Sequence, residues 1–228
     1  CGGCSFQNLD YKIQTQQKSA QIKDVFNRIG GFNSLIIEPI EVCNKIYKYR
    51  NKMEFTFSNR RWILKEEPEN VNSNFALGLH IPGRYDKILN INQCDIQQDK
   101  ANTILNIVRK CTKDMKPYDI IEHKGFLRNL MIRHAENTNE IMINIVTSSE
   151  DTEALKPLVN KLVNNIDNIK SIVNNITQRK AGVSIGEYEI NLYGKDFIKE
   201  IINGMMFNIS ANSFFQTNTK QTEKLYSM

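Results

Sequence analysis

The chain has 228 residues, of which 40% are hydrophobic and 24% are charged. This composition is typical of a globular protein with one or two domains and excludes a disordered, collagen-like or low-complexity chain. No apolar run approaches the roughly 18 residues of a membrane-spanning helix, and the first residues do not resemble a secretory signal. The net charge of +5 favours an anionic partner only weakly.

The N-terminal half is predicted to contain a helix, four short strands and a second helix. Residues 6–30 have apolar side chains at an imperfect helical period, which stops at Gly30. Alternating polarity and short length then predict strands over residues 49–58, 61–65, 75–80 and 87–91. Apolar residues at helical spacing predict the second helix over residues 99–113.

The C-terminal half adds strands and two more helices. Strands are predicted over residues 126–134, 141–147, 171–176, 187–193 and 206–210. Asp151 and Thr152 cap a strongly amphipathic helix, and a last helix is expected to start near Asn218. The mixture predicts an α+β fold in which residues from about 35 to 210 form one domain. Because the chain starts at Cys1 and ends inside a predicted helix, we expect a fragment of a longer protein.

Five cysteines offer candidate ligands. Their odd number, without a signal peptide, favours a reducing compartment over a disulfide framework. Cys1 and Cys4 form a C-x-x-C pair, which occurs in redox dithiols, zinc sites and iron–sulfur sites, and the spacing leaves metal binding and redox chemistry equally open. Cys94 follows a predicted strand in a turn-like stretch and is the candidate third ligand. Cys43 and Cys111 lie beside apolar or helical patterns and are expected to be buried thiols.

The first predicted strands are rich in positive charge. Residues 45–65 include seven basic residues and one acid, Glu54. Alternation in the strand separates an apolar face from a charged face: Tyr49, Met53, Phe55 and Phe57 against Arg50, Lys52 and Glu54. Such a strand packs against a core on one side and presents cations to phosphate groups on the other. An ordinary solvated strand face is the alternative interpretation.

Five stretches, in order along the chain, resemble one known family. The stretch CGGCSFQNLDYKIQTQQK at the start resembles the cluster segment of the bacterial 23S ribosomal RNA uracil-5-methyltransferases of the RumA/RlmD type. Four further stretches are similar to that family: residues 49–55, residues 79–84 through Cys94, residues 125–128 with Arg133, and residues 213–218. The order and number of these matches make the resemblance specific.

The resemblance implies cofactors and site residues. Cys1, Cys4 and Cys94 would be three ligands of a structural 4Fe–4S cluster, whose first ligand would lie six residues before Cys1. Gln216, within the stretch Phe-Phe-Gln-Thr-Asn, would contact S-adenosyl-L-methionine. The implied RNA-binding residues are Arg50, Lys52, Arg128 and Arg133. Since Arg128 and Arg133 are five positions apart, a regular strand would point them to opposite faces unless a bulge intervenes.

The resemblance also implies an activity and an organisation. The full-length protein would be a cytoplasmic, monomeric enzyme without a membrane segment that methylates C5 of a uridine in 23S ribosomal RNA. Residues 1–30 would form the iron–sulfur segment, residues 31–210 the central RNA-binding domain, and residues 211–228 the start of a Rossmann-like methyltransferase domain. No catalytic residue is expected in this chain, which would be inactive alone. The alternatives are a transfer RNA uracil-5-methyltransferase and a non-catalytic iron–sulfur or RNA-binding module.

Overall fold

The computed structural model describes residues 1–32, 34–180 and 185–228. Their contacts divide the chain into two compact units. The smaller unit comprises residues 4–46, and the larger one comprises residues 1–3 together with residues 47–228. No helix in the described ranges combines the length and apolar character needed to cross a membrane.

The smaller unit consists of one helix and an extended return segment. Helix α1 (Tyr11–Asp24) continues into a single π-helical stretch, Val25–Ile29. The helix starts later than predicted because the Asp10 side chain caps it, accepting a hydrogen bond from the Lys12 N–H group at 2.9 Å. In the return segment, the Cys43 N–H group donates to the Tyr11 hydroxyl at 2.8 Å. Cys43 is half-buried there and not a core thiol.

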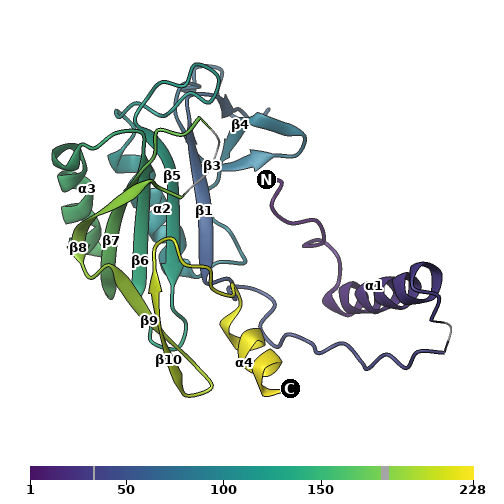
Figure 1. Ribbon diagram of the computed structural model, residues 1–228. Helices are drawn as coiled ribbons and strands as arrows, with labels where there is room; N and C mark the ends of the chain where they lie inside the picture. The colour runs from purple at the N-terminus through teal and green to yellow at the C-terminus, as the bar shows by residue number, and fades with distance from the viewer. Residues whose placement is uncertain (33, 181–184) are drawn as a thin grey trace. The chain divides into compact units, whose positions relative to one another are not determined.

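The larger unit is built around an eight-stranded mixed sheet in the order β2–β4–β3–β1–β5–β6–β7–β8 (Figure 1). Its strands are β1 (Lys52–Ser58), β2 (Arg61–Trp62), β3 (Ala76–Ile81), β4 (Arg84–Asn90), β5 (Leu127–His134), β6 (Ile141–Thr147), β7 (Ile169–Ile176) and β8 (Tyr188–Gly194). Neighbouring strands are antiparallel, except that β4 runs parallel to β2 and β7 to β6. The predicted α+β fold and the strands predicted for this sheet are confirmed.

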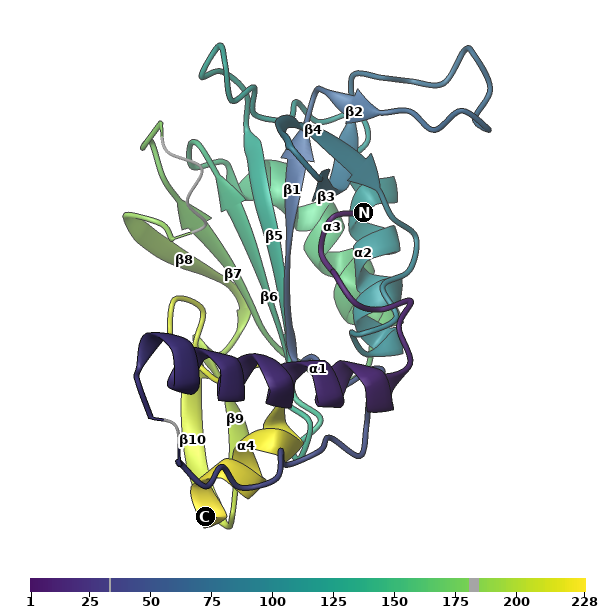
Figure 2. The ribbon, with the colours of Figure 1, turned by 90° about the vertical axis from the view of Figure 1, so that its right-hand side faces the viewer.

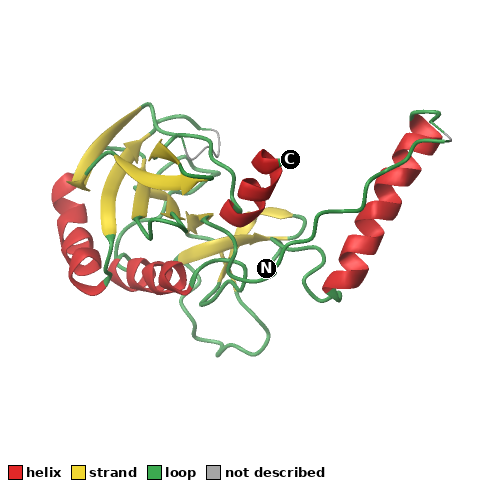
Figure 3. Ribbon diagram, turned by 90° about the horizontal axis from the view of Figure 1, so that it is seen from below, coloured by secondary structure: helices red, strands yellow, loops and turns green. Residues whose placement is uncertain are grey.

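Helices α2 (Asp99–Cys111) and α3 (Thr152–Asn165) cover one face of the sheet (Figure 3). Their apolar sides are buried against alternate strand residues such as Phe55 and Ile132. The α3 N-terminus is capped as predicted, because the Asp151 side chain accepts from the Ala154 N–H group at 3.0 Å. The prediction of a buried Cys111 is wrong. The buried side of α2 runs from Val108 to Thr112 one turn later and leaves Cys111 exposed.

Part of the opposite face, over β6 and β7, is covered by the hairpin of β9 (Phe197–Ile202) and β10 (Met205–Ser210) (Figure 2). Strand β9 was not predicted, because the charged Glu200 interrupts its apolar pattern. The turn between the two strands is Asn203-Gly204, with both residues at positive φ, and this pair is a strong hairpin signal. After the hairpin, helix α4 (Thr219–Ser227) begins at its predicted cap, Asn218, whose side chain accepts from the Gln221 N–H group at 3.1 Å.

Candidate functional site

The residues just before β1 form a junction between two distant parts of the chain. The Arg50 N–H group donates to the Ile96 carbonyl at 2.8 Å, in the loop that contains Cys94. The next N–H group, of Asn51, donates to the Thr217 carbonyl at 2.9 Å. The fold therefore brings Arg50 beside both the loop of Cys94 and the segment that contains Gln216.

Lys52 and Arg133 are direct neighbours across strands β1 and β5. Burial lowers the pKa of the half-buried Lys52, and the positive charges of Arg133 and Arg50 lower it further, with Glu54 opposing them. Burial alone lowers the pKa of Arg133 to about 10. This end of the sheet face thus gathers three cations around one acid, and two of the cations are partly or fully removed from water.

Arg133 is a buried cation with little compensation. Its side chain is among the largest of the fully buried ones, with 1% exposed. Its Nη2 atom donates to the Ser213 carbonyl at 2.8 Å, but Nε and Nη1 have no partner in the described part of the chain. Nor do the described residues supply a carboxylate within ion-pair distance. A guanidinium in this state is costly to bury, so an added anion or hydrogen-bond acceptor would be stabilised here.

The segment that contains Gln216 is held by its backbone. The Gln216 carbonyl accepts a hydrogen bond from Asn51 Nδ2 at 2.9 Å, while its side chain is exposed. Upstream, the Asn212 side-chain amide donates to Asn175 Oδ1 at 3.0 Å, and the Ser213 carbonyl receives Arg133. The fold therefore fixes the main chain around Gln216 and leaves its amide side chain accessible to a ligand.

Arg128 lies at the other end of β5, away from the three cations Arg50, Lys52 and Arg133. A register shift between Leu127 and Asn129 provides the bulge that was one of the two predicted alternatives. The guanidinium stacks over the Tyr118 ring, 4.2 Å from its centroid, and donates to the Thr177 carbonyl at 3.1 Å. Burial lowers the pKa of Arg128, and Tyr118 opposes this effect. An RNA contact by Arg128 stays a prediction.

The predicted cluster ligands are distributed over the two units. Cys94 is half-buried in a loop held by Asn102, whose Oδ1 atom accepts from the Cys94 N–H group at 2.8 Å. Cys1 is exposed at the start of the same unit, and Cys4 belongs to the smaller unit. Across the described ranges, no three His, Cys, Asp or Glu side chains are grouped to hold a metal ion.

A 4Fe–4S cluster takes four thiolates, and the predicted set supplies three. The described residues therefore do not form a cluster site by themselves. The ligand roles of Cys1, Cys4 and Cys94 stay predictions, and no chemical step is derived from a cluster.

Sequence reasoning missed Asn51, Thr219 and Glu200, which hold the segment around Gln216. Asn51 lies inside the motif-like stretch of residues 49–55. Its basic neighbours Arg50 and Lys52 led us to interpret this stretch by its charge alone. Glu200 gave a usable signal, since it is flanked at alternate positions by Ile198 and Ile202 in a strand-like pattern. A charge in the middle of such a pattern indicates a buried polar contact.

Comparisons with known proteins converge on one class. No protein-family model matches the sequence. An uncharacterized RNA methyltransferase of Chlorobaculum tepidum is 37% identical over 233 residues, which cover 99% of this chain and 48% of that protein. An uncharacterized RNA methyltransferase of Porphyromonas gingivalis is 36% identical over 237 residues, which cover 99% of this chain and 50% of that protein.

A solved structure matches as well. It is the crystal structure of Pyrococcus abyssi tRNA (uracil-54, C5)-methyltransferase in complex with S-adenosyl-L-homocysteine. The TM-score is 0.73 at 26% sequence identity, and the match covers 100% of this chain and 49% of that one. The chain thus spans about half the length of the relatives it matches. It is a homologue of the RNA methyltransferases related to the uracil-C5 enzymes, aligned to about half of their length.

Proposed function

We propose that this chain is the RNA-facing part of an S-adenosylmethionine-dependent enzyme that methylates C5 of a uridine in 23S ribosomal RNA. The observation that supports it most is the cluster of Arg50, Lys52 and Arg133 beside the segment of Gln216. The homology to RNA methyltransferases supports the same class of reaction.

The cations have separate parts in this proposal. Arg50 and Lys52 are partly exposed, so they contact phosphates of the RNA backbone, which positions the substrate without reading its sequence. Arg133 lies deeper, and its unpaired Nε and Nη1 atoms offer donors to an acceptor that reaches the sheet past Ser213. Because the guanidinium is desolvated, one added acceptor there gains more than it would at the surface.

Gln216 contacts the cofactor in this proposal. S-adenosylmethionine supplies the methyl group, and the solved relative was crystallised with S-adenosyl-L-homocysteine, the form that remains after methyl transfer. Uracil C5 would become nucleophilic when a thiolate adds at C6. Once C5 carries the methyl group, a base would remove the C5 proton, and the C6–S bond would break to release the thiolate. Neither Cys43 nor Cys111 is assigned the thiolate role, since neither lies in a stretch that resembles the family's catalytic motif.

Cys1, Cys4 and Cys94 enter the proposal as three cluster ligands, with a structural function. They also support ribosomal RNA as the substrate, because the family whose cluster segment this chain resembles acts on 23S ribosomal RNA. The solved relative acts on tRNA, and that observation favours transfer RNA as the second candidate substrate.

Nucleoside mass spectrometry distinguishes these substrates. 23S ribosomal RNA and transfer RNA are purified separately from a strain lacking the gene and from the same strain complemented with it. We expect the amount of 5-methyluridine in 23S ribosomal RNA to fall in the strain lacking the gene and to be restored by complementation. Loss of 5-methyluridine from transfer RNA instead would make transfer RNA the substrate and reject ribosomal RNA. Unchanged 5-methyluridine in both fractions would reject the enzyme and favour a non-catalytic RNA-binding module.

A further inference from the structure

Glu200 is a fully buried carboxylate whose contacts are all hydrogen-bond donors. Its Oε2 atom accepts from the Glu136 N–H group at 2.7 Å, and its Oε1 atom accepts from the N–H groups of Asn137 and Ile201, both at 3.0 Å. No lysine or arginine among the described residues forms an ion pair with it. The carboxylate therefore joins hairpin β9–β10 to the loop after β5. Because most of its donors are backbone N–H groups, they cannot move away from it as a flexible side chain could.

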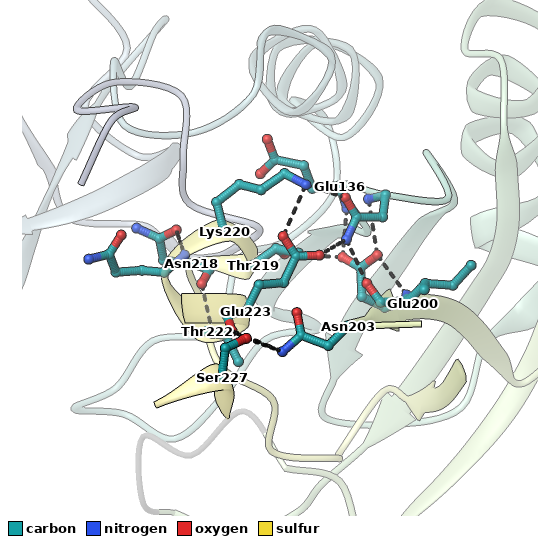
Figure 4. A network of polar contacts seen from close by, with 12 residues as sticks. Glu136, Glu200, Asn203, Asn218, Thr219, Lys220, Thr222, Glu223 and Ser227 are labelled. Carbon is teal, nitrogen blue, oxygen red and sulfur yellow. Dashed lines mark hydrogen bonds and ion pairs between the residues drawn. The ribbon is translucent and has the colours of Figure 1, made fainter. Parts of the chain in front are cut away.

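The fourth donor to Glu200 comes from helix α4. The Thr219 hydroxyl donates to Glu200 Oε2 at 3.1 Å (Figure 4). Because this hydroxyl has a single proton, the lone pairs of its oxygen are left to accept, and Asn51 Nδ2 donates to it at 2.9 Å. Asn51 Nδ2 uses its second proton on the Gln216 carbonyl at 2.9 Å. Glu200 accepts and so fixes the direction of the Thr219 hydroxyl, while the Asn51 amide nitrogen can only donate, so the bonds run in one order from Asn51 through Thr219 to Glu200.

An outer group of contacts closes over the same helix turn. Asn137 Nδ2 donates to Glu223 Oε1 at 2.7 Å, and Lys220 Nζ donates to Asn137 Oδ1 at the same distance. Asn203, at the hairpin turn, donates to the Glu223 carbonyl at 2.9 Å (Figure 4). These outer residues are mostly exposed, whereas Asn51, Thr219 and Glu200 are buried. The buried three are therefore the contacts that water does not replace.

We propose that Glu200, Thr219 and Asn51 are positioning residues that fix the main chain at Gln216 relative to Arg50 and Lys52. This inference rests on the proposed function, in which Gln216 contacts S-adenosylmethionine and the two basic residues contact RNA. Asn51 lies between those basic residues in sequence and bonds directly to the Gln216 carbonyl, so the strand that meets RNA and the segment that meets the cofactor share one buried amide. The arrangement sets the distance between cofactor and substrate before either binds.

The hydrogen bonds that run from the Gln216 carbonyl through Asn51 and Thr219 to Glu200 form a relay. Thr219→Val tests this relay, because valine keeps the shape of threonine and removes the hydroxyl. In the full-length enzyme we expect the KM for S-adenosylmethionine and the Kd for S-adenosylhomocysteine to rise about three- to tenfold. Thr219→Ser keeps the hydroxyl and should stay within about twofold of wild type. Glu200→Gln should act like Thr219→Val, because its amide nitrogen would face N–H and O–H donors.

The matched control is Val159→Ala, in helix α3 on the opposite face of the sheet. It destabilises the same unit through a lost core contact and should leave KM and Kd unchanged. Equal values of KM and Kd in Thr219→Val and Val159→Ala, at equal loss of stability, would overturn the positioning role.

A second readout separates this inference from the proposed function. In the 228-residue chain, Thr219→Val should accelerate hydrogen exchange at the Asn51 and Thr222 amides, while Val159→Ala should not do so selectively. If the wild-type enzyme fails to methylate RNA, the proposed function is rejected, and the amide exchange still tests the relay. Unchanged exchange at Asn51 would overturn the inference whatever the activity.

Discussion

Replacing Arg133 by methionine tests whether the buried cation is kept for function at a cost in stability. Each tenfold change in an acidity constant corresponds to about 1.4 kcal/mol, so lowering the pKa of Arg133 from its ordinary value above 12 to about 10 corresponds to roughly 3 kcal/mol. The lost hydrogen bond to the Ser213 carbonyl is worth about 1–2 kcal/mol. We therefore expect Arg133→Met to raise the free energy of unfolding by about 1–2 kcal/mol.

The sign of this effect does not depend on pH near neutrality. A cation whose pKa is lowered on folding destabilises the folded state at every pH below its folded-state pKa. For Arg133 the penalty is complete up to about pH 10 and is relieved only above it. Urea denaturation of the 228-residue chain at pH 6, 7 and 8 should give the same gain at each pH.

Arg109→Met is the matched control. Burial likewise lowers the pKa of Arg109 to about 10. This guanidinium is well satisfied, however, since it donates to the carbonyls of Leu77 and Ile91 and to the side chains of Asn92 and Asn106. Its removal leaves those acceptors unpaired and should cost about 2–4 kcal/mol. If Arg133→Met is as destabilising as Arg109→Met, the Arg133 guanidinium is not an uncompensated charge and our reasoning is wrong.

Three further predictions concern charge, pH and metal. Arg50→Ala with Lys52→Ala should weaken RNA binding and reduce the slope of log affinity against log salt by about two; an unchanged slope in filter binding would contradict phosphate contact. Burial acts to raise the pKa of Asp119, but hydrogen bonds from Asn59 and from backbone N–H groups outweigh it and lower the pKa. This carboxylate therefore stabilises the fold above about pH 4, and that stabilisation is lost as the pH falls. Asp119→Asn should accordingly show a flatter loss of urea midpoint between about pH 5 and 2, and an unchanged profile would contradict it. Full-length protein purified anaerobically should absorb broadly near roughly 400 nm and lose this band in Cys94→Ser, whereas colourless wild-type protein would reject the cluster.

Local patterns were enough for most of the fold. Alternation placed Met53, Phe55 and Phe57 on the buried side of β1, and side-chain caps marked the starts of two helices, at Asp151 and Asn218. These features depend on neighbours within a few residues. That dependence explains why a single sequence predicts them.

The details of the site depend on partners far along the chain. Asn51 bonds to residues 165 and 168 positions later, and Arg133 bonds to a carbonyl 80 positions later. The resemblance implied an RNA contact for Arg133 and gave no sign of its burial, which comes from the segment that returns across the sheet. Strand β9 was missed for a related reason, since Glu200 is buried only because donors from other elements converge on it.

Release of tritium from RNA labelled at C5 of uracil tests the central claim most directly. C5 methylation breaks the C5–H bond once for each methyl group gained. The full-length protein, given S-adenosylmethionine and labelled 23S ribosomal RNA transcript, should therefore release one tritium for each methyl group incorporated. Methyl incorporation without tritium release would place the reaction at another atom, and the absence of both would contradict the proposed activity.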